Sequence, residues 1–184
     1  MRWPAVVFGV LILVLLAAGV WYGLSLSANP FIRQLKEAEA VLQKEPDNFS
    51  ALMDAGQATY NLKRYSKAVD YYTRATQVKP SEAVAWNNLA NVKRDLKRFS
   101  DAEKDYQKAL TLAPKEVQYH TNLADLYRLW AKEDPEKGAM VEETLLQALK
   151  ALPGNPRLIN MLISYYEAKG ELKKADEWWA TDGR

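Results

Sequence analysis

The chain has no cysteine, one histidine, and few glycine and proline residues. Without cysteine it cannot form a disulfide, a thiolate metal site or a cysteine nucleophile. A single histidine, His120, excludes a histidine-rich metal site and a relay between two histidines. Eight glycines and eight prolines in 184 residues are few for an all-β chain built on tight turns. The composition therefore argues against thiol chemistry, against histidine-based metal chemistry and against an all-β fold.

Charge of one sign is not in excess, since 25 Lys and Arg residues stand against 23 Asp and Glu residues. A nucleic-acid binder with a broad basic face would carry a larger positive excess. No glycine-rich phosphate loop, nucleophile elbow or cluster of metal ligands appears along the chain. We therefore expect no nucleic-acid partner, no metal, no cofactor and no enzymatic activity.

The N-terminal region contains one long stretch without charge, between Arg2 and Arg33. Within it, residues 4–26 are nearly all apolar and would span about 34 Å as a helix, enough for a hydrocarbon core of about 30 Å. A cleaved signal peptide is the alternative, but its apolar region would be shorter. We expect residues 1–29 to form a short tail and a single transmembrane helix. The residues expected to lie at or in the membrane are Trp3, Gly19, Trp21, Tyr22 and Gly23.

The charges on the two sides of this expected span give nearly equal support to the two possible orientations. Arg2 and the N-terminal amine lie on one side, and several lysine and arginine residues follow the span on the other. A short positive N-terminus resembles a signal anchor. This favours an extracytoplasmic, periplasmic position for the rest of the chain, with the cytoplasmic side as the alternative.

The remainder of the chain repeats with a period of 34 residues, as the distance from Pro80 to Pro114 illustrates. Small residues recur where paired helices would approach closely, and large residues recur where they would fill the space between them. The proline at the end of each unit cannot continue a helix. The other matching pairs are Leu52 and Trp86, Gly56 and Ala90, Tyr65 and Phe99, Ala68 and Ala102, Tyr72 and Tyr106, and Ala75 and Ala109.

This pattern resembles the tetratricopeptide repeat (TPR) family, most closely in the run Trp86-x-x-Leu89-Ala90 … Ala102-x-x-x-Tyr106 … Pro114. The resemblance covers residues 31–184 and implies an all-α chain, in which a right-handed α-α superhelix, or TPR solenoid, follows the transmembrane helix. The expected units are a linking half-repeat helix at 30–46, TPR 1 at 47–80, TPR 2 at 81–114, TPR 3 at 115–153 with a five-residue insertion near 133–138, and an atypical C-terminal TPR 4 at 154–184.

In such a solenoid the first helices of successive units line the concave side. The positions that would face this groove are rich in amides and include a few cations. Because Asn and Gln both donate and accept hydrogen bonds, they suit the main chain of an extended peptide. We therefore expect a protein or peptide partner in the groove. The expected binding residues are Met53, Gln57, Asn87, Asn88, Asn91, Arg94, Gln118, Asn122, Asp125, Arg128 and Arg157.

One TPR subgroup binds a C-terminal carboxylate with two asparagines and three basic residues. Asn91, Asn122 and Arg157 match three of these positions, whereas Asn87 and Met161 replace two of the cations. Fewer charge-assisted hydrogen bonds argue against tight carboxylate capture.

Other conspicuous residues have structural interpretations. His120 falls at a packing position between paired helices, and Ser100-x-x-Glu103 fits a capping box that would start a helix. Trp178 and Trp179 are adjacent on a helix and cannot both face inward. The acidic residues expected on solvated helix faces are Glu103, Asp105, Glu142 and Glu143.

These observations lead to a membrane-anchored TPR scaffold or adaptor that binds a peptide segment or assembles a membrane protein complex. The alternative is a structural accessory subunit of a larger membrane complex, held by its span and its convex face.

Overall fold

The computed structural model describes residues 29–181, and all regular structure in this range is helical. Several helices begin or end close to proline and asparagine residues. In chain order the elements are α2 (Pro30–Lys44), α3 (Phe49–Asn61), α4 (Tyr65–Val78), α5 (Ala83–Asp95), α6 (Phe99–Leu112), α7 (Val117–Trp130), η1 (Pro135–Gly138), α8 (Ala139–Ala151), α9 (Pro156–Lys169) and α10 (Leu172–Thr181).

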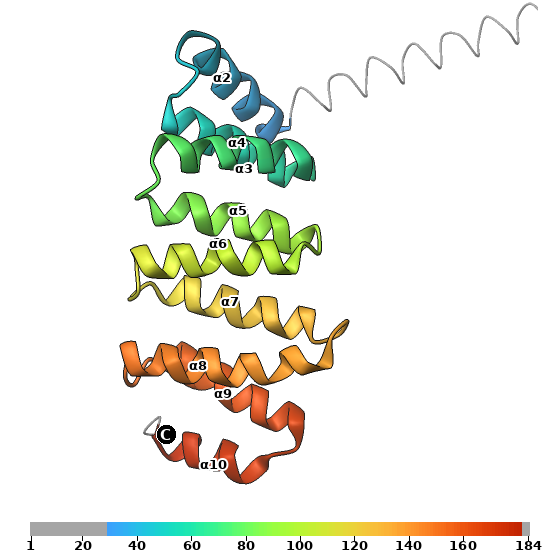
Figure 1. Ribbon diagram of the computed structural model, residues 1–184, viewed down its shortest axis with the longest axis vertical. Coiled ribbons are helices and arrows are strands. Elements are labelled where there is room, and N and C mark those ends of the chain that lie inside the picture. Colours follow the sequence, from blue (N-terminus) through green and yellow to red (C-terminus); the bar gives the residue numbers. More distant parts are fainter. Residues whose placement is uncertain (1–28, 182–184) are drawn as a thin grey trace, which may run out of the picture.

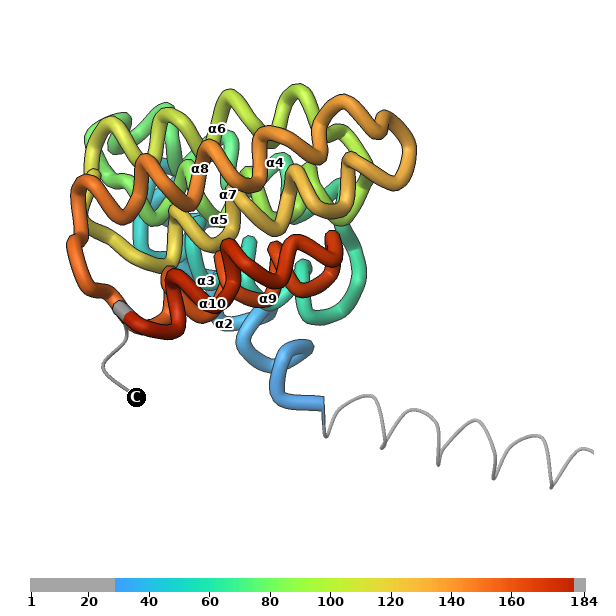
Figure 2. Tube along the Cα trace, turned by 90° about the horizontal axis from the view of Figure 1, so that it is seen from below, coloured from blue at the N-terminus to red at the C-terminus, as the bar shows by residue number. Residues whose placement is uncertain are grey.

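The helices stack one after another along the long axis of the molecule, from α2 at one end to α10 at the other (Figure 1). Each α-helix packs against the next in the chain, so α3–α4, α5–α6, α7–α8 and α9–α10 form successive pairs. In addition, α5 contacts α7 and α7 contacts α9. In the view along the stack, α6 and α8 lie to one side of α5 and α7 (Figure 2). The first helices of the pairs therefore line one face of the stack.

Asparagine residues start several of these helices. The side-chain oxygens of Asn29, Asn48 and Asn155 each accept a hydrogen bond from a backbone N–H in the first turn of α2, α3 and α9. Such caps satisfy amide groups that have no partner within the helix. Pro30 and Pro156 follow two of these caps, where a missing N–H costs nothing.

The second helices of the first two pairs begin after a tight backbone turn instead of a side-chain cap. Lys63 and Lys97 adopt left-handed backbone conformations, with φ of 58° and 60°, in the short turns that precede α4 and α6. Helix α6 begins at Phe99 after Arg98, which makes no side-chain cap. The predicted capping box that starts at Ser100 is therefore wrong, because the tight backbone turn already sets the start of the helix.

Close approach between paired helices depends on small residues. A Cβ atom on Gly56 would lie 2.6 Å from Cε1 of Tyr72, so only glycine fits there while the ring keeps its place. The equivalent small residues Ala90 and Ala124 are also buried. One apolar cluster then runs without interruption from α5 to α10. The expected alternation of small and large residues is confirmed as the basis of the packing.

The prediction of a single-pass membrane protein needs correction. None of the helices between residues 29 and 181 has both the length and the apolar character that crossing a bilayer requires. The segment predicted to span, residues 4–26, lies outside the described residues, as do Trp3, Gly19, Trp21, Tyr22 and Gly23. The all-α repeat part of the predicted fold stands, and the membrane location is withdrawn.

Candidate functional site

The candidate site is the groove formed by the first helices α3, α5, α7 and α9. Four of the predicted groove residues bond to one another across these helices, Asn122 to Asn87 and Arg157 to Gln118, and the exposure of the predicted residues differs widely. Asn87 and Asn122 are buried. Met53, Asn88, Asn91, Arg94 and Asp125 are half-buried. Gln57, Gln118, Arg128 and Arg157 are exposed.

A chain of side-chain hydrogen bonds crosses the groove from α9 to α5. Arg157 Nη1 lies 3.4 Å from Gln118 Oε1, and Gln118 Nε2 donates to Asn122 Oδ1 at 3.1 Å. Asn122 Nδ2 then donates to Asn87 Oδ1 at 2.8 Å, and Asn87 Nδ2 to Asn88 Oδ1 at 3.3 Å. Many of the hydrogen bonds that these amides can form are therefore made with each other. We call this chain the amide ladder.

A second network surrounds Arg94 on α5. Its guanidinium lies 2.9 Å from the Asp95 carboxylate, and Tyr60 on α3 donates to the same carboxylate at 2.5 Å. Tyr106 on α6 donates to Asn91 Oδ1 at 2.6 Å. The positive charge of Arg94 is therefore balanced inside the protein, and Asn91 already has a partner.

Burial and these bonds shift the pKa values of groove residues. Burial, and then the hydrogen bond to Asp95, raise the pKa of Tyr60 to about 12. For Arg94, burial alone would lower the pKa, but Tyr106 and Asp95 outweigh it and the pKa is raised. Tyr60 is therefore neutral and Arg94 charged at physiological pH, which keeps the network intact.

The groove opens into a cleft of about 850 Å³ between α7 and α9. Its apolar floor consists of Ala124, Val141 and Leu145, which are buried. Met161 and Tyr165 are half-buried at its wall. Three cations and one carboxylate also border it: Arg128, Arg157, Lys169 and Asp125. A cleft of this size, largely apolar with a few polar groups, is the usual form of a ligand site.

Sequence reasoning found only part of this cleft. It placed Asp125, Arg128 and Arg157 on the groove, and all three line the cleft. It missed Leu145 and Val141 because they belong to α8, a second helix, which the concave-face rule leaves out. The signal was present in the repeat spacing, since Leu145 stands 39 residues after Tyr106, where the repeat expects a large aromatic residue.

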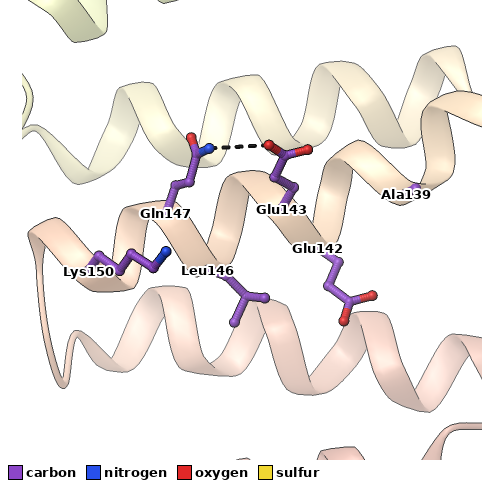
Figure 3. Close-up of a pocket in the computed structure, with 6 residues that line it drawn as sticks. All are labelled: Ala139, Glu142, Glu143, Leu146, Gln147 and Lys150. Carbon is purple, nitrogen blue, oxygen red and sulfur yellow. Dashed lines mark hydrogen bonds between the residues drawn. The ribbon is translucent and has the colours of Figure 1, made fainter.

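The outer face of α8 carries a shallower pocket of about 370 Å³. Figure 3 shows Glu143 and Gln147 pointing to one side of α8 and Glu142 and Leu146 to the other. Gln147 Nε2 donates to Glu143 Oε1 at 3.3 Å. Glu142 accepts a hydrogen bond from Tyr166 at 2.8 Å. These acidic groups serve helix packing and solvation, and nothing pairs them as an acid and a base.

Two further predictions have opposite outcomes. His120 is buried, as expected, and its Nε2 lies 2.8 Å from Pro114 O, so Nε2 carries the proton and donates. Trp86, one repeat earlier, donates to Pro80 O at 2.9 Å in the same way. Asp105, expected on a solvated face, is instead buried with its Oδ2 2.5 Å from Lys93 Nζ. Burial raises the pKa of Asp105 although Lys93 opposes the shift.

A metal site finds no support in the described part of the chain. Across residues 29–181, no group of three or more histidine, aspartate or glutamate side chains lies close enough together to hold a metal ion.

The paired helices and their shared groove define the chain as a helical-repeat solenoid. Tetratricopeptide repeat models match it at residues 35–83 and 83–116. Residues 35–116 therefore match tetratricopeptide repeats, which confirms for this part the resemblance predicted from the sequence. No curated protein sequence matches the chain.

Solved structures extend the likeness to most of the chain. The crystal structure of MamA is similar with a TM-score of 0.68 at 18% identity, over 83% of this chain and 86% of that one. MamA 41-end from Desulfovibrio magneticus RS-1 gives 0.66 at 20% identity, over 90% and 92%. The first TPR of Spaghetti (RPAP3), bound to the HSP90 peptide SRMEEVD, gives 0.55 at 21% identity, over 66% and 95%. At these identities the likeness shows the fold.

Proposed function

We propose that this protein is a scaffold that binds a segment of another protein in the groove of α3, α5, α7 and α9. The observation that carries the proposal is the cleft between α7 and α9, which combines an apolar lining with charged groups at its border. The tetratricopeptide repeats support it, because repeats of this kind form extended concave surfaces suited to extended ligands. The peptide bound to the first TPR of RPAP3 supports the same mode of binding.

The amide ladder has a defined part in this proposal. Asn122 and Asn87 are buried and bonded to each other, so they hold α7 and α5 in register. Gln57 and Gln118 are exposed and can rearrange toward a ligand. The exposed glutamines, more than the buried asparagines, are therefore the groups that would meet a peptide main chain.

Tight capture of a C-terminal carboxylate is not part of the proposal. Two of the cations that such a clamp uses are replaced by Asn87 and Met161. Asn91 already accepts hydrogen bonds from Tyr106 and Arg94, and Asn122 is buried in the ladder. An internal segment suits this groove better than a chain terminus.

The test is selection of random displayed peptides on the full-length chain, followed by affinity measurement of the enriched peptides by fluorescence polarisation. The double variant Gln57→Ala and Gln118→Ala should weaken their binding by about fivefold or more, because each lost hydrogen bond contributes about 0.5–1.5 kcal/mol. The matched control is Gln107→Ala and Gln147→Ala, two exposed glutamines on the second helices α6 and α8.

The outcome distinguishes the two faces of the solenoid. Loss of binding in the control variant alone would move the site to the second helices and support an accessory subunit held by its convex face. No enrichment of any peptide would remove the groove as a peptide site.

A further inference from the structure

The turns that join the two helices of each pair lie along one side of the stack (Figure 1). They comprise residues 62–64, 96–98, 131–138 and 170–171, and we call this side the turn edge. Its first two turns carry the same pair of cations, Lys63 and Arg64 between α3 and α4, and Lys97 and Arg98 between α5 and α6. None of these four residues belongs to the amide ladder or lines the cleft between α7 and α9. The turn edge is therefore a surface apart from the groove.

The backbones of the first two turns are equivalent. Lys63 and Lys97 have φ of 58° and 60°. The N–H groups of these lysines each donate to the carbonyl group three residues earlier, at 2.8 Å. Those of Arg64 and Arg98 each donate to the carbonyl group five residues earlier, also at 2.8 Å. The two Lys-Arg pairs are therefore presented by the same local fold, and they differ in the side chains around them.

In the second turn the protein supplies a carboxylate to each cation. Lys97 Nζ lies 2.7 Å from Glu133 Oε1, which belongs to the connection between α7 and α8. Arg98 donates from Nε and Nη2 to Asp101 Oδ2, at 3.2 Å and 2.7 Å. This bond to Arg98 is the main reason why the pKa of Asp101 is lowered. A Lys-Arg turn of this shape thus binds two carboxylates that come from different elements of the chain.

The first turn lacks both carboxylates. One repeat before Asp101 stands Lys67, so a third cation takes the place of an acid. One repeat before Glu133 stands Phe99, which is buried. Residues 55–69 contain no Asp or Glu. The first turn therefore has three cations where the second has two ion pairs.

Neighbouring acids do not compensate for this difference. Asp95 on α5 is already bonded to an arginine and a tyrosine of the groove. Asp70 is the next acid along α4. Within residues 29–181, the side chains of Lys63, Arg64 and Lys67 form no ion pair, with Asp70 or with any other acid, and all three residues are exposed. Exposed cations of this kind remain available to an outside anion and attract it over a distance.

We propose that the first turn is a docking surface for an acidic segment of a partner protein. The carboxylates of this segment bind Lys63 and Arg64 in the way that the protein's own carboxylates bind the second turn. Arginine binds carboxylates through charge-assisted N–H bonds, and Lys67 adds a third positive charge. The inference goes beyond the proposed function, because it adds a second binding surface at the edge of the solenoid, outside the groove.

The experiment measures peptide binding to the full-length chain by fluorescence polarisation at low ionic strength. The acidic peptide is Glu-Asp-Glu-Gly-Asp-Glu and its uncharged counterpart is Gln-Asn-Gln-Gly-Asn-Gln, both with blocked termini and the same neutral label. We expect the acidic peptide to bind about fivefold or more tightly, because three exposed charge pairs each contribute modestly. Its affinity should fall as salt is added. Equal binding of the two peptides would overturn the proposal.

The decisive variant is Lys67→Asp, which gives the first turn the acid that the second turn has. Asp101 occupies the same position in the first turn of α6, so the variant should fold, which circular dichroism and thermal unfolding check. The new carboxylate binds Arg64, and the affinity for the acidic peptide should fall about fivefold or more. Lys108→Asp, at an exposed position of α6, changes the net charge equally and should bind nearly as the original chain does. Unchanged binding in Lys67→Asp, or an equal loss in both variants, would overturn the proposal.

The reverse substitution, Asp101→Lys, gives the second turn the three cations of the first. It frees Arg98 from its carboxylate and creates a second surface of the same kind. Binding of the acidic peptide should rise about twofold or more, since exposed charge pairs contribute similarly at the two turns. Unchanged or weaker binding would count against the part assigned to the acid at this position.

Two comparisons separate this surface from the groove and from other anions. The double variant Gln57→Ala and Gln118→Ala should still bind the acidic peptide, and Lys67→Asp should still bind peptides selected on the groove, so the two proposals fail independently. Loss of the acidic peptide in the glutamine variant would place it in the groove and overturn the inference. A single-stranded oligonucleotide with as many phosphates as the peptide has carboxylates should bind more weakly. Tighter binding of the oligonucleotide that Lys67→Asp abolishes would assign the surface to nucleic acid instead.

Discussion

Single residues set the geometry of the turns that join the paired helices. Lys63 and Lys97 adopt φ values near 60°, a region that side chains with a Cβ disfavour by about 1–2 kcal/mol. The same position in the last pair is Gly170, with φ of 74°, and glycine has no such penalty. The two lysines therefore hold a strained conformation that the surrounding helix contacts maintain.

This strain predicts that Lys63→Gly stabilises the protein. The free energy of unfolding should rise by about 0.5–1 kcal/mol. Glycine has no Cβ and so removes the steric strain of the left-handed conformation, and the greater entropy of the unfolded chain offsets part of this gain. Urea unfolding followed by circular dichroism measures it. Lys108→Gly, in the middle of α6, is the control and should destabilise by about 1 kcal/mol. Equal effects of both substitutions would show that the backbone conformation at Lys63 is not strained.

At the scale of the helix, one small and one large residue face each other in each of the first three pairs. Gly56 lies against the Tyr72 ring in the first pair, and the pairs Ala90 with Tyr106 and Ala124 with Leu145 occupy the corresponding positions. In the last pair Ile163 and Trp179 stand there, and Trp179 remains 37% exposed. Trp178 packs against the core instead, which confirms that the two tryptophans face differently.

The fit of α3 against α4 predicts that Gly56→Ala is destabilising. The new Cβ would lie 2.6 Å from a ring atom of Tyr72, so the ring or the helix must shift, at a cost of about 1–3 kcal/mol. The midpoint of urea unfolding should fall accordingly. Gly138→Ala is the matched control, because its Cβ would meet Ala131 at an ordinary 3.8 Å. A Gly56 variant as stable as the control would contradict the close approach of the two helices.

At the scale of the whole molecule, tyrosine hydroxyl groups bonded to carboxylates join the pairs along the stack. Tyr60 donates to Asp95, Tyr71 to Glu39, and Tyr166 to Glu142. Burial, followed by the bond to the carboxylate, raises the pKa of Tyr60, Tyr71 and Tyr166 to about 12. The folded protein therefore keeps these protons at a pH at which the unfolded chain releases them.

This linkage predicts that stability falls in alkaline solution. Because the folded pKa lies above the ordinary value of 10, the contribution of these tyrosines is fully present below pH 10 and is lost as the pH rises to about 12. Urea unfolding near pH 9 and near pH 11 measures the loss. The double variant Tyr71→Phe and Tyr166→Phe should show a smaller loss. An unchanged slope in that variant would assign the effect to other groups, such as lysines.

The sequence by itself determined the repeat and most of its structural consequences. Its period of 34 residues, the recurring small residues and the proline at the end of each unit predicted paired helices, a buried His120 and a groove on the first helices. These features are local or strictly periodic, so they can be read without knowing which residues meet in space. The capping box at Ser100 and the solvated position of Asp105 are the predictions within the repeats that the described structure contradicts.

Tertiary structure decided how the groove residues are used. It paired Asn122 with Asn87, buried Asp105 beside Lys93, and formed a cleft between α7 and α9. Each of these depends on side chains from different helices, whose distances follow from how α5, α7, α8 and α9 pack. A periodic pattern shows which face a residue shares, but only the packing of neighbouring helices determines whether its polar atoms are satisfied by the protein or remain available to a ligand.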